Sequence, residues 1–133
     1  EYASYSRKLC ERNAQAEGVN NAAFQKGDAR HLDFPDETFD AVTSNYVYHN
    51  VMGADKRVLL LETLRVLKKG GVFALNDDMK PRMYGDMEEF ARELRDMGYE
   101  DVRLIDTAAE AFGSRRWAAM MMLDNSRMLV GRK

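Results

Sequence analysis

The stretch "GDARHLDFPDETFDAVTSNYVYHN", residues 27–50, carries the end of one predicted strand and the whole of the next. The first strand, 22–28, ends at Asp28, and the second, 39–45, ends at Asn45. Polar and aromatic side chains therefore gather at the ends of the strands and not within them. In open α/β sheets, ligands bind outside the carboxyl ends of the strands. The stretch predicts a ligand site built from these two strand ends.

Helical and strand patterns alternate along the rest of the chain. Such alternation is typical of a mainly parallel sheet with helices on both faces. The last two strands lack an obvious full crossover between them, so we expect an antiparallel last strand. The predicted elements are helix 55–67, strand 72–78, a helix that begins after the capping residue Asp86, strand 100–107, a helical segment within 114–123 and strand 126–133.

Each predicted helix has an apolar face and a stop signal. Glycines end the helices, at Gly18, Gly70-Gly71 and Gly98. The chain opens without Met and already inside a helical pattern, from which we expect a chain that is truncated at its amino terminus. The residues expected on the buried faces are Tyr2, Tyr5, Leu9 and Ala16 in the first helix, Val58, Leu61, Leu64 and Leu67 in the second, and Met87, Phe90, Leu94 and Met97 in the third.

Composition limits the classes of function. The chain has 133 residues, enough for one domain with a real core, and a net charge of -2 that gives no electrostatic footprint for nucleic acid. The single cysteine, Cys10, excludes an internal disulfide and fits a reducing compartment. No apolar run approaches a membrane span and no signal peptide opens the chain. We expect a single cytoplasmic domain, 1–133, with no membrane or nucleic-acid partner.

Three segments, read together, resemble class I S-adenosylmethionine-dependent methyltransferases. They are "KGDARHLDFPDETFDAVTSNYVYHN", "LLETLRVLKKGGVFALND" and "MEEFARELRDMGYEDVRLID". The resemblance covers nearly the whole chain and rests on the order and spacing of the segments. It implies a Rossmann-like sheet with an antiparallel last strand, the cofactor S-adenosylmethionine, and methyl transfer from the sulfonium to a nucleophile. The family's acceptors include small metabolites, proteins and nucleic acids, and the lack of basic patches favours a small-molecule acceptor over nucleic acid. Residues 1–133 would then be the carboxyl-terminal portion of the full domain.

The resemblance also implies roles for individual residues. Asp28 is similar to the acidic residue that accepts a hydrogen bond from the adenine amino group, and Ala29 would offer its backbone amide to the ring. Asn45 and Tyr46 match the segment along the methionine part of the cofactor. His49 falls near the transferred methyl group, where it would act as a base.

The glycine-rich loop of the family, and the acid that holds the ribose hydroxyls, do not occur in the sequence. By spacing, that acid would lie at or just before Glu1. Because a glycine loop lets the backbone approach the cofactor closely, we expect this chain alone to bind cofactor weakly. The resemblance also implies that two further strands of the family lie in the sheet between strands 22–28 and 39–45. Without them a sheet edge would stay free, and we expect a homodimer through that edge or through the Met-rich segment.

Other candidate residues have competing interpretations. Asp77-Asp78 suggests a substrate-side role or a metal site, and without a third ligand we predict no metal. We expect the Met-rich segment, with Trp117, Met120, Met121 and Met122, to pack in the core, and a substrate lid or partner face is the alternative. His31 is expected to be a solvated loop residue and Tyr48 a packing residue. Two rival functions remain: a non-catalytic methyltransferase-like binding module, and another nucleotide-binding Rossmann domain such as a dehydrogenase.

Overall fold

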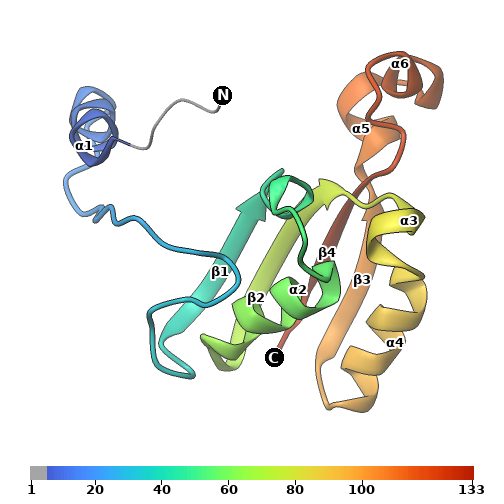
Figure 1. Cartoon of the computed structure of the whole chain (residues 1–133), viewed down its shortest axis with the longest axis horizontal. Helices are drawn as coiled ribbons and strands as arrows, with labels where there is room; N and C mark the ends of the chain where they lie inside the picture. The colour runs from blue at the N-terminus through green and yellow to red at the C-terminus, as the bar shows by residue number, and fades with distance from the viewer. Residues whose placement is uncertain (1–5) are drawn as a thin grey trace.

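A computed structural model describes residues 6–133, without the side chains of residues 111 and 112. Helices cover one face of a four-stranded sheet, and a separate helix precedes it (Figure 1). The elements are α1 (Arg7–Ala16), β1 (Phe39–Asn45), the short 3-10 helix η1 (Tyr48–Asn50), α2 (Lys56–Arg65), β2 (Leu67–Asp78), α3 (Pro81–Tyr84), α4 (Met87–Asp96), β3 (Glu100–Asp106), α5 (Thr107–Phe112), α6 (Arg115–Met120) and β4 (Ser126–Arg132).

The sheet has the strand order β1-β2-β4-β3. β1 pairs with β2 in parallel, and β4 is antiparallel to both β2 and β3. Three strands therefore share one direction and only the last strand in the chain runs against them. This confirms the α/β, Rossmann-like fold class and its antiparallel last strand. It also brings the carboxyl ends of β1, β2 and β3 to one edge of the sheet, where a ligand would bind.

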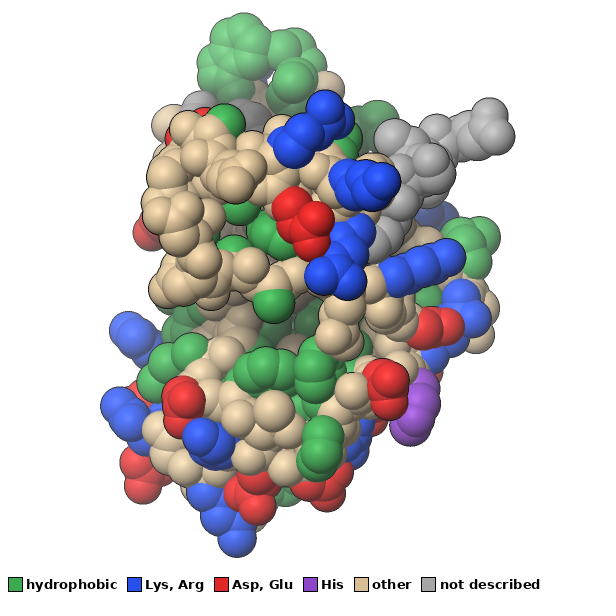
Figure 2. Space-filling model, turned by 90° about the vertical axis from the view of Figure 1, so that its left-hand side faces the viewer, with side chains coloured by type: hydrophobic (Ala, Val, Ile, Leu, Met, Phe, Trp, Pro, Cys, Tyr) green, Lys and Arg blue, Asp and Glu red, His purple; other side chains and the backbone are tan. Residues whose placement is uncertain are grey.

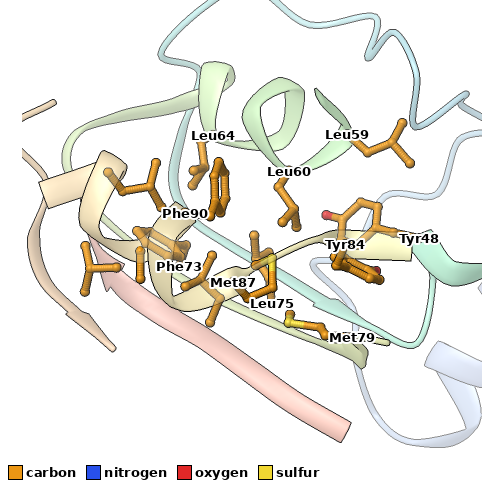
Figure 3. Close-up of a cluster of buried hydrophobic side chains, with 14 of the residues drawn as sticks. Tyr48, Leu59, Leu60, Leu64, Phe73, Leu75, Met79, Tyr84, Met87 and Phe90 are labelled. Carbon is orange, nitrogen blue, oxygen red and sulfur yellow. The ribbon is translucent and has the colours of Figure 1, made fainter. Parts of the chain in front are cut away.

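The hydrophobic core lies between the sheet and the helices α2, α3 and α4 (Figure 3). Leu60 and Leu64 of α2 face Phe73 and Leu75 of β2, and Phe90 of α4 completes this layer. All five side chains are at most 3% exposed. Burial of this apolar area stabilises the fold by about 25 cal/mol per Å² removed from water. The core holds β1 and β2 in register and so fixes the edge at which they end.

The opposite face of the sheet is more open within the described residues. Val72 is 45% exposed, and Ala41 and Thr43 of β1 are exposed on the same face. The prediction of helices on both faces is therefore met on one face in residues 6–133. β1 forms the edge of the sheet in these residues, so association through that edge stays a prediction. No described helix is both long and apolar enough to cross a membrane.

The predicted strand 22–28 is wrong. Residues 22–27 have no regular secondary structure, and Asp28 forms only an isolated bridge with His31. A strand needs a hydrogen-bonding neighbour, and the four-stranded sheet of the described chain ends at β1. The segment instead runs as a loop between α1 and β1 (Figure 1). Helix α1 and the positive φ of Gly18 agree with prediction. The buried face expected for this helix is wrong in the described residues, because Leu9 is 48% exposed and Ala16 is also exposed. Tyr2 and Tyr5 lie outside the described residues.

The predicted face of the second helix is also wrong. Val58 and Leu61 are 57% and 38% exposed, whereas Leu59, Leu60 and Leu64 are buried. The run "VLLLETL" supports two overlapping apolar faces at helical spacing, and only the position of β2 decides between them. In α4, Met87, Phe90 and Leu94 are buried as predicted, but Met97 follows the helix and is 61% exposed.

The predicted helix stop at Gly70-Gly71 is displaced. α2 already ends at Arg65, and the two glycines lie inside β2. Gly71 is required there because a Cβ at this position would lie 2.8 Å from the backbone oxygen of Asp40. Gly71 therefore permits close approach of β2 to β1, and neither glycine caps the helix.

Candidate functional site

The carboxyl end of β1 is held against β2 by Asn45, the last residue of the strand, and by Tyr46, the residue after it. Asn45 pairs with Asn76 in the ladder, and the backbone N–H of Tyr46 donates to the carbonyl of Asn76 at 2.9 Å. Tyr46 has a φ of 52°, in the left-handed region that ends a strand sharply. The chain therefore turns away from the sheet at Tyr46 and enters η1, which carries His49.

A chain of polar side chains crosses this edge of the sheet. Asn76 Nδ2 donates to Asn45 Oδ1 at 2.8 Å, and Thr107 Oγ1 donates to Asn76 Oδ1 at 3.0 Å. Ser126 Oγ lies 2.8 Å from Thr107 Oγ1 and 2.6 Å from the Tyr46 hydroxyl. The network joins β1, β2, β4 and the start of α5, so the side chains at the edge are held by one another.

His49 pairs with a buried carboxylate at the end of β2. Its Nδ1 lies 2.5 Å from Oδ1 of Asp77, which is fully buried, while the His49 side chain is 30% exposed. Oδ2 of Asp77 accepts from the backbone N–H groups of Tyr48 and His49 at 2.8 and 3.1 Å. Oδ1 also accepts from the N–H of Asp78 at 2.7 Å. A charged carboxylate is stable when buried if hydrogen bonds of this kind satisfy it.

Two tyrosines enclose this carboxylate. Tyr48 is 3% exposed, and its hydroxyl lies 2.8 Å from Thr63 Oγ1, which confirms it as a packing residue. Burial raises the pKa of Tyr48, and burial followed by the negative charge of Asp77 raises the pKa of Tyr84 far above its usual range. Both hydroxyls therefore stay neutral beside Asp77, leaving His49 as the exposed partner of the pair.

Asp28 and Ala29 form a turn at the rim of an apolar pocket. The Asp28 carboxylate accepts from the N–H of Arg30 at 2.9 Å and stays 58% exposed. Ala29 lines a pocket of about 570 Å³ together with Asn45 and Val47. Figure 2 faces the β1 side of the molecule and shows hydrophobic side chains around a hollow across its middle. The other residues of the pocket are Leu32, Phe34, Phe39, Ala41, Val42, Thr43, Ser44, Tyr48, Thr63 and Val66.

The structure thus places the residues singled out from the sequence in two groups. Ala29 and Asn45 share the apolar pocket, with Asp28 next to Ala29 in the chain. Tyr46 and His49 form the other group, with their rings edge to face and 6.3 Å between centroids. The roles assigned to these five residues stay predictions.

Sequence reasoning missed the partner of His49 and the polar chain beside it. The sequence marks Asp77 as a residue at the carboxyl end of a strand and as one of two adjacent carboxylates, and it gives no sign of a role for Asn76, Thr107 or Ser126. The only available signal was that Asp77 ends a strand next to β1. Its contact with His49 spans 28 residues of sequence, and no local pattern indicates such a pairing.

Other candidates have ordinary surroundings. Asp78 pairs with Lys80 at 2.7 Å, and no group of three metal-ligating side chains occurs within residues 6–133. His31, with a side chain 87% exposed, is a solvated loop residue as predicted. The expectation that the Met-rich segment packs in the core is wrong, because Trp117 is 60% and Met122 69% exposed.

Known proteins place the chain in a family. The methyltransferase domain family matches residues 1–75. An uncharacterized methyltransferase of Bacillus subtilis (strain 168) is 44% identical over 68 residues, covering 51% of this chain and 26% of the relative. A fatty-acid O-methyltransferase of Mycolicibacterium smegmatis is 40% identical over 88 residues, covering 66% and 29%. The chain therefore spans about a quarter of the length of these relatives.

Solved structures support the same assignment at the level of the fold. A geranyl diphosphate methyltransferase in complex with S-adenosylmethionine superposes with a TM-score of 0.67 at 13% identity, over 98% of this chain and 65% of the other. The chain belongs to the S-adenosylmethionine-dependent methyltransferase family. Membership of this family decides against the dehydrogenase alternative.

The residues present fit part of the family's cofactor. Adenine is a flat apolar ring with an amino group at one edge, and the apolar pocket carries the Asp28 turn at its rim. The carboxylate of Asp28 is free to accept a further hydrogen bond because it is exposed and accepts through two oxygens.

Proposed function

We propose that this chain contributes one wall of an S-adenosylmethionine site and the base of a methyl-transfer reaction on a small-molecule acceptor. The observation that carries the proposal is that the apolar pocket and the His49–Asp77 pair adjoin each other at the end of β1. Asn45 and Tyr48 line the pocket, and the backbone N–H of Tyr48 donates to Asp77, the partner of His49. In sheets of this kind, the ligand lies across the carboxyl ends of adjacent strands.

The cofactor supplies a methyl group that is already bound to a positively charged sulfur and is therefore electrophilic. The chain's residues position the reactants and take a proton where the acceptor has one to lose. Asp28 would accept from the adenine amino group, and the backbone of Ala29 would meet the ring. Asn45 and Tyr46 would border the methionine part, with His49 beside the methyl group.

Net charge and composition support a proposal about the class of methyl acceptor and the compartment of the chain. A net charge of -2 gives nucleic acid no basic surface, and one relative is named for a fatty-acid acceptor. A small, partly apolar acceptor is therefore the proposal. The single cysteine, Cys10, favours the reducing environment of the cytoplasm.

Binding of S-adenosylhomocysteine to an Asp28→Ala variant tests the cofactor site. Asp28 is exposed, so the substitution leaves the core intact. Loss of one charge-assisted hydrogen bond is worth about 1.5 kcal/mol, or roughly tenfold in affinity. Titration calorimetry should show this loss for Asp28→Ala and unchanged binding for the control Asp33→Ala, which alters an exposed acid in the same loop.

Equal affinity of Asp28→Ala and the unaltered chain would remove Asp28 from the site. If the unaltered chain bound no S-adenosylhomocysteine at millimolar concentrations, the non-catalytic binding module would become the better account. Both outcomes are measured with S-adenosylhomocysteine alone, so neither requires that the methyl acceptor be known.

A further inference from the structure

The Asp77 carboxylate is fixed in place before any ligand arrives. It is fully buried, and three backbone N–H groups, those of Tyr48, His49 and Asp78, donate to it. Backbone donors hold a carboxylate in its ionised form, in which it can only accept hydrogen bonds. Two of the three donors belong to η1, so the same bonds fix the position of the segment that carries His49.

This arrangement determines which nitrogen of His49 carries the proton. Nδ1 lies 2.5 Å from Asp77 Oδ1, and because an ionised carboxylate only accepts, Nδ1 must donate. In the neutral ring, Nε2 then carries the lone pair. Nε2 has no hydrogen-bond partner within residues 6–133, and the ring is partly exposed at the edge of the sheet. The ring therefore presents a proton acceptor at the site.

We infer that Asp77 is a positioning residue that fixes the tautomer of His49, and that the acceptor of the site is a neutral hydroxyl compound whose proton Nε2 removes. The inference rests on the proposed function and narrows its acceptor class. As the oxygen–methyl bond forms, the hydroxyl proton passes to Nε2 and the imidazolium pairs with Asp77. The cofactor would supply the methyl group from its sulfonium and would keep the electron pair of the broken sulfur–methyl bond, and His49 would return its proton to water.

A carboxylate acceptor fits this site less well. It is already ionised at neutral pH and needs no base. It would also approach the negative charge of Asp77, which the neutral His49 ring does not cancel. A neutral phenol or enol, in contrast, gains a hydrogen bond to Nε2 in the ground state and an ion pair between His49 and Asp77 after proton transfer. The acceptor should therefore differ in class from that of the fatty-acid relative.

The tautomer can be read directly by ¹⁵N NMR of the two imidazole rings at alkaline pH. His49 should have its proton on Nδ1, with that proton strongly deshielded by Asp77, and His31 serves as an exposed reference in the same spectrum. In Asp77→Asn, the amide nitrogen can donate to Nδ1, so the proton of His49 should move to Nε2. A proton on Nε2 in the unaltered chain would overturn the inference, whether or not Asp77→Asn folds.

The acceptor class is tested with a matched pair of probes, 1-naphthol and 1-naphthoate. Millimolar 1-naphthol should shift the Nε2 resonance of His49 and leave that of His31 unchanged, whereas 1-naphthoate should shift neither. A larger His49 shift with 1-naphthoate, or no shift with 1-naphthol, would reject the hydroxyl class. Neither result depends on cofactor binding, so intact binding of S-adenosylhomocysteine alongside either failure would reject this inference and leave the proposed function standing.

Discussion

Tyr46 occupies a backbone conformation that few side chains of its size adopt. Its φ is 52°, and its N–H donates to the carbonyl of Asn76 while its hydroxyl reaches Ser126 Oγ at 2.6 Å. A non-glycine residue in this region is held there by its contacts. The tyrosine therefore ties the turn that leads to His49 to the far strand β4.

Replacement of Tyr46 by Phe should lower the free energy of unfolding by about 1 kcal/mol. The change removes the hydroxyl that meets Ser126, which is itself fully buried. Urea unfolding measures the loss. Tyr99→Phe is the matched control, because the Tyr99 hydroxyl makes no hydrogen bond within the described residues. Equal stabilities of the two variants would show that the contact contributes nothing.

At this scale, the sequence predicts where β1 ends but not the pairing of side chains beside that end. Asn45 and His49 were identified because they follow a recognisable strand, a signal that is local in the chain. The role of Asp77 depends on how β1 and β2 align and on where η1 turns back. That information lies in the packing of Leu75 and Tyr48 and not in any short pattern.

Helix α2 anchors the loop that carries Asp28. Oε1 of Glu62 accepts from the N–H of Leu32 and from Arg65 Nη2, both at 2.8 Å, and Arg65 Nη2 also donates to the carbonyl of Leu32 at 2.9 Å. The hydrogen bond from Arg65 is the main reason that the pKa of Glu62 falls from 4.5 to about 2. A carboxylate whose pKa falls on folding stabilises the protein above its unfolded pKa, and this contribution is lost as pH falls toward the folded value.

Glu62→Gln should therefore reduce stability by about 1 kcal/mol at neutral pH, since it removes the charge from a hydrogen-bonded pair. The difference from the unaltered chain should shrink as the pH falls from about 4.5 to about 2, where the carboxylate of the folded protein also becomes protonated. Urea unfolding at pH 7 and pH 3 measures both values. Glu88→Gln, an exposed change on α4, is the control. A difference that grew on acidification would contradict this account of the Glu62 contact.

The secondary structure was largely predictable because caps, turns and apolar periods are local signals. Asp86 begins α4 as expected, and its carboxylate accepts from the N–H groups of Glu88 and Glu89. The predictions that failed concern elements whose structure depends on a neighbour. Residues 22–28 have no strand beside them in the described chain, and packing against β2 determines which face of α2 is buried. Tertiary contacts decide wherever a local pattern permits two structures.

At the scale of the whole molecule, the central strands β2 and β4 of the sheet approach each other closely. Phe73 is opposite Gly131 in the ladder, and a Cβ at Gly131 would lie 2.6 Å from the Phe73 ring. The glycine makes room for the aromatic ring at the centre of the core. The sequence predicts the antiparallel strand but not the need for glycine at position 131. That need arises only where Phe73 and Gly131 lie opposite each other in the ladder.

Gly131→Ala should destabilise the protein by about 1–3 kcal/mol through overpacking against Phe73. Thermal unfolding followed by circular dichroism measures the change. Gly27→Ala is the matched control, since a Cβ there meets nothing within 4 Å and its φ is not positive, so the melting temperature should hardly move. Similar melting temperatures for both variants would mean that the sheet adjusts at Phe73 without cost.

Chemical-shift mapping of S-adenosylhomocysteine on the ¹⁵N-labelled chain tests the central claim most directly, because it detects weak binding and locates it. The claim is that the edge where β1 and β2 end is one wall of a cofactor site. We expect the amides of Asp28, Ala29, Asn45 and Tyr46 to shift progressively, with a dissociation constant on the order of 1 mM. An unchanged spectrum at several millimolar, or shifts confined to the surface between α1 and the loop after it, would contradict the claim.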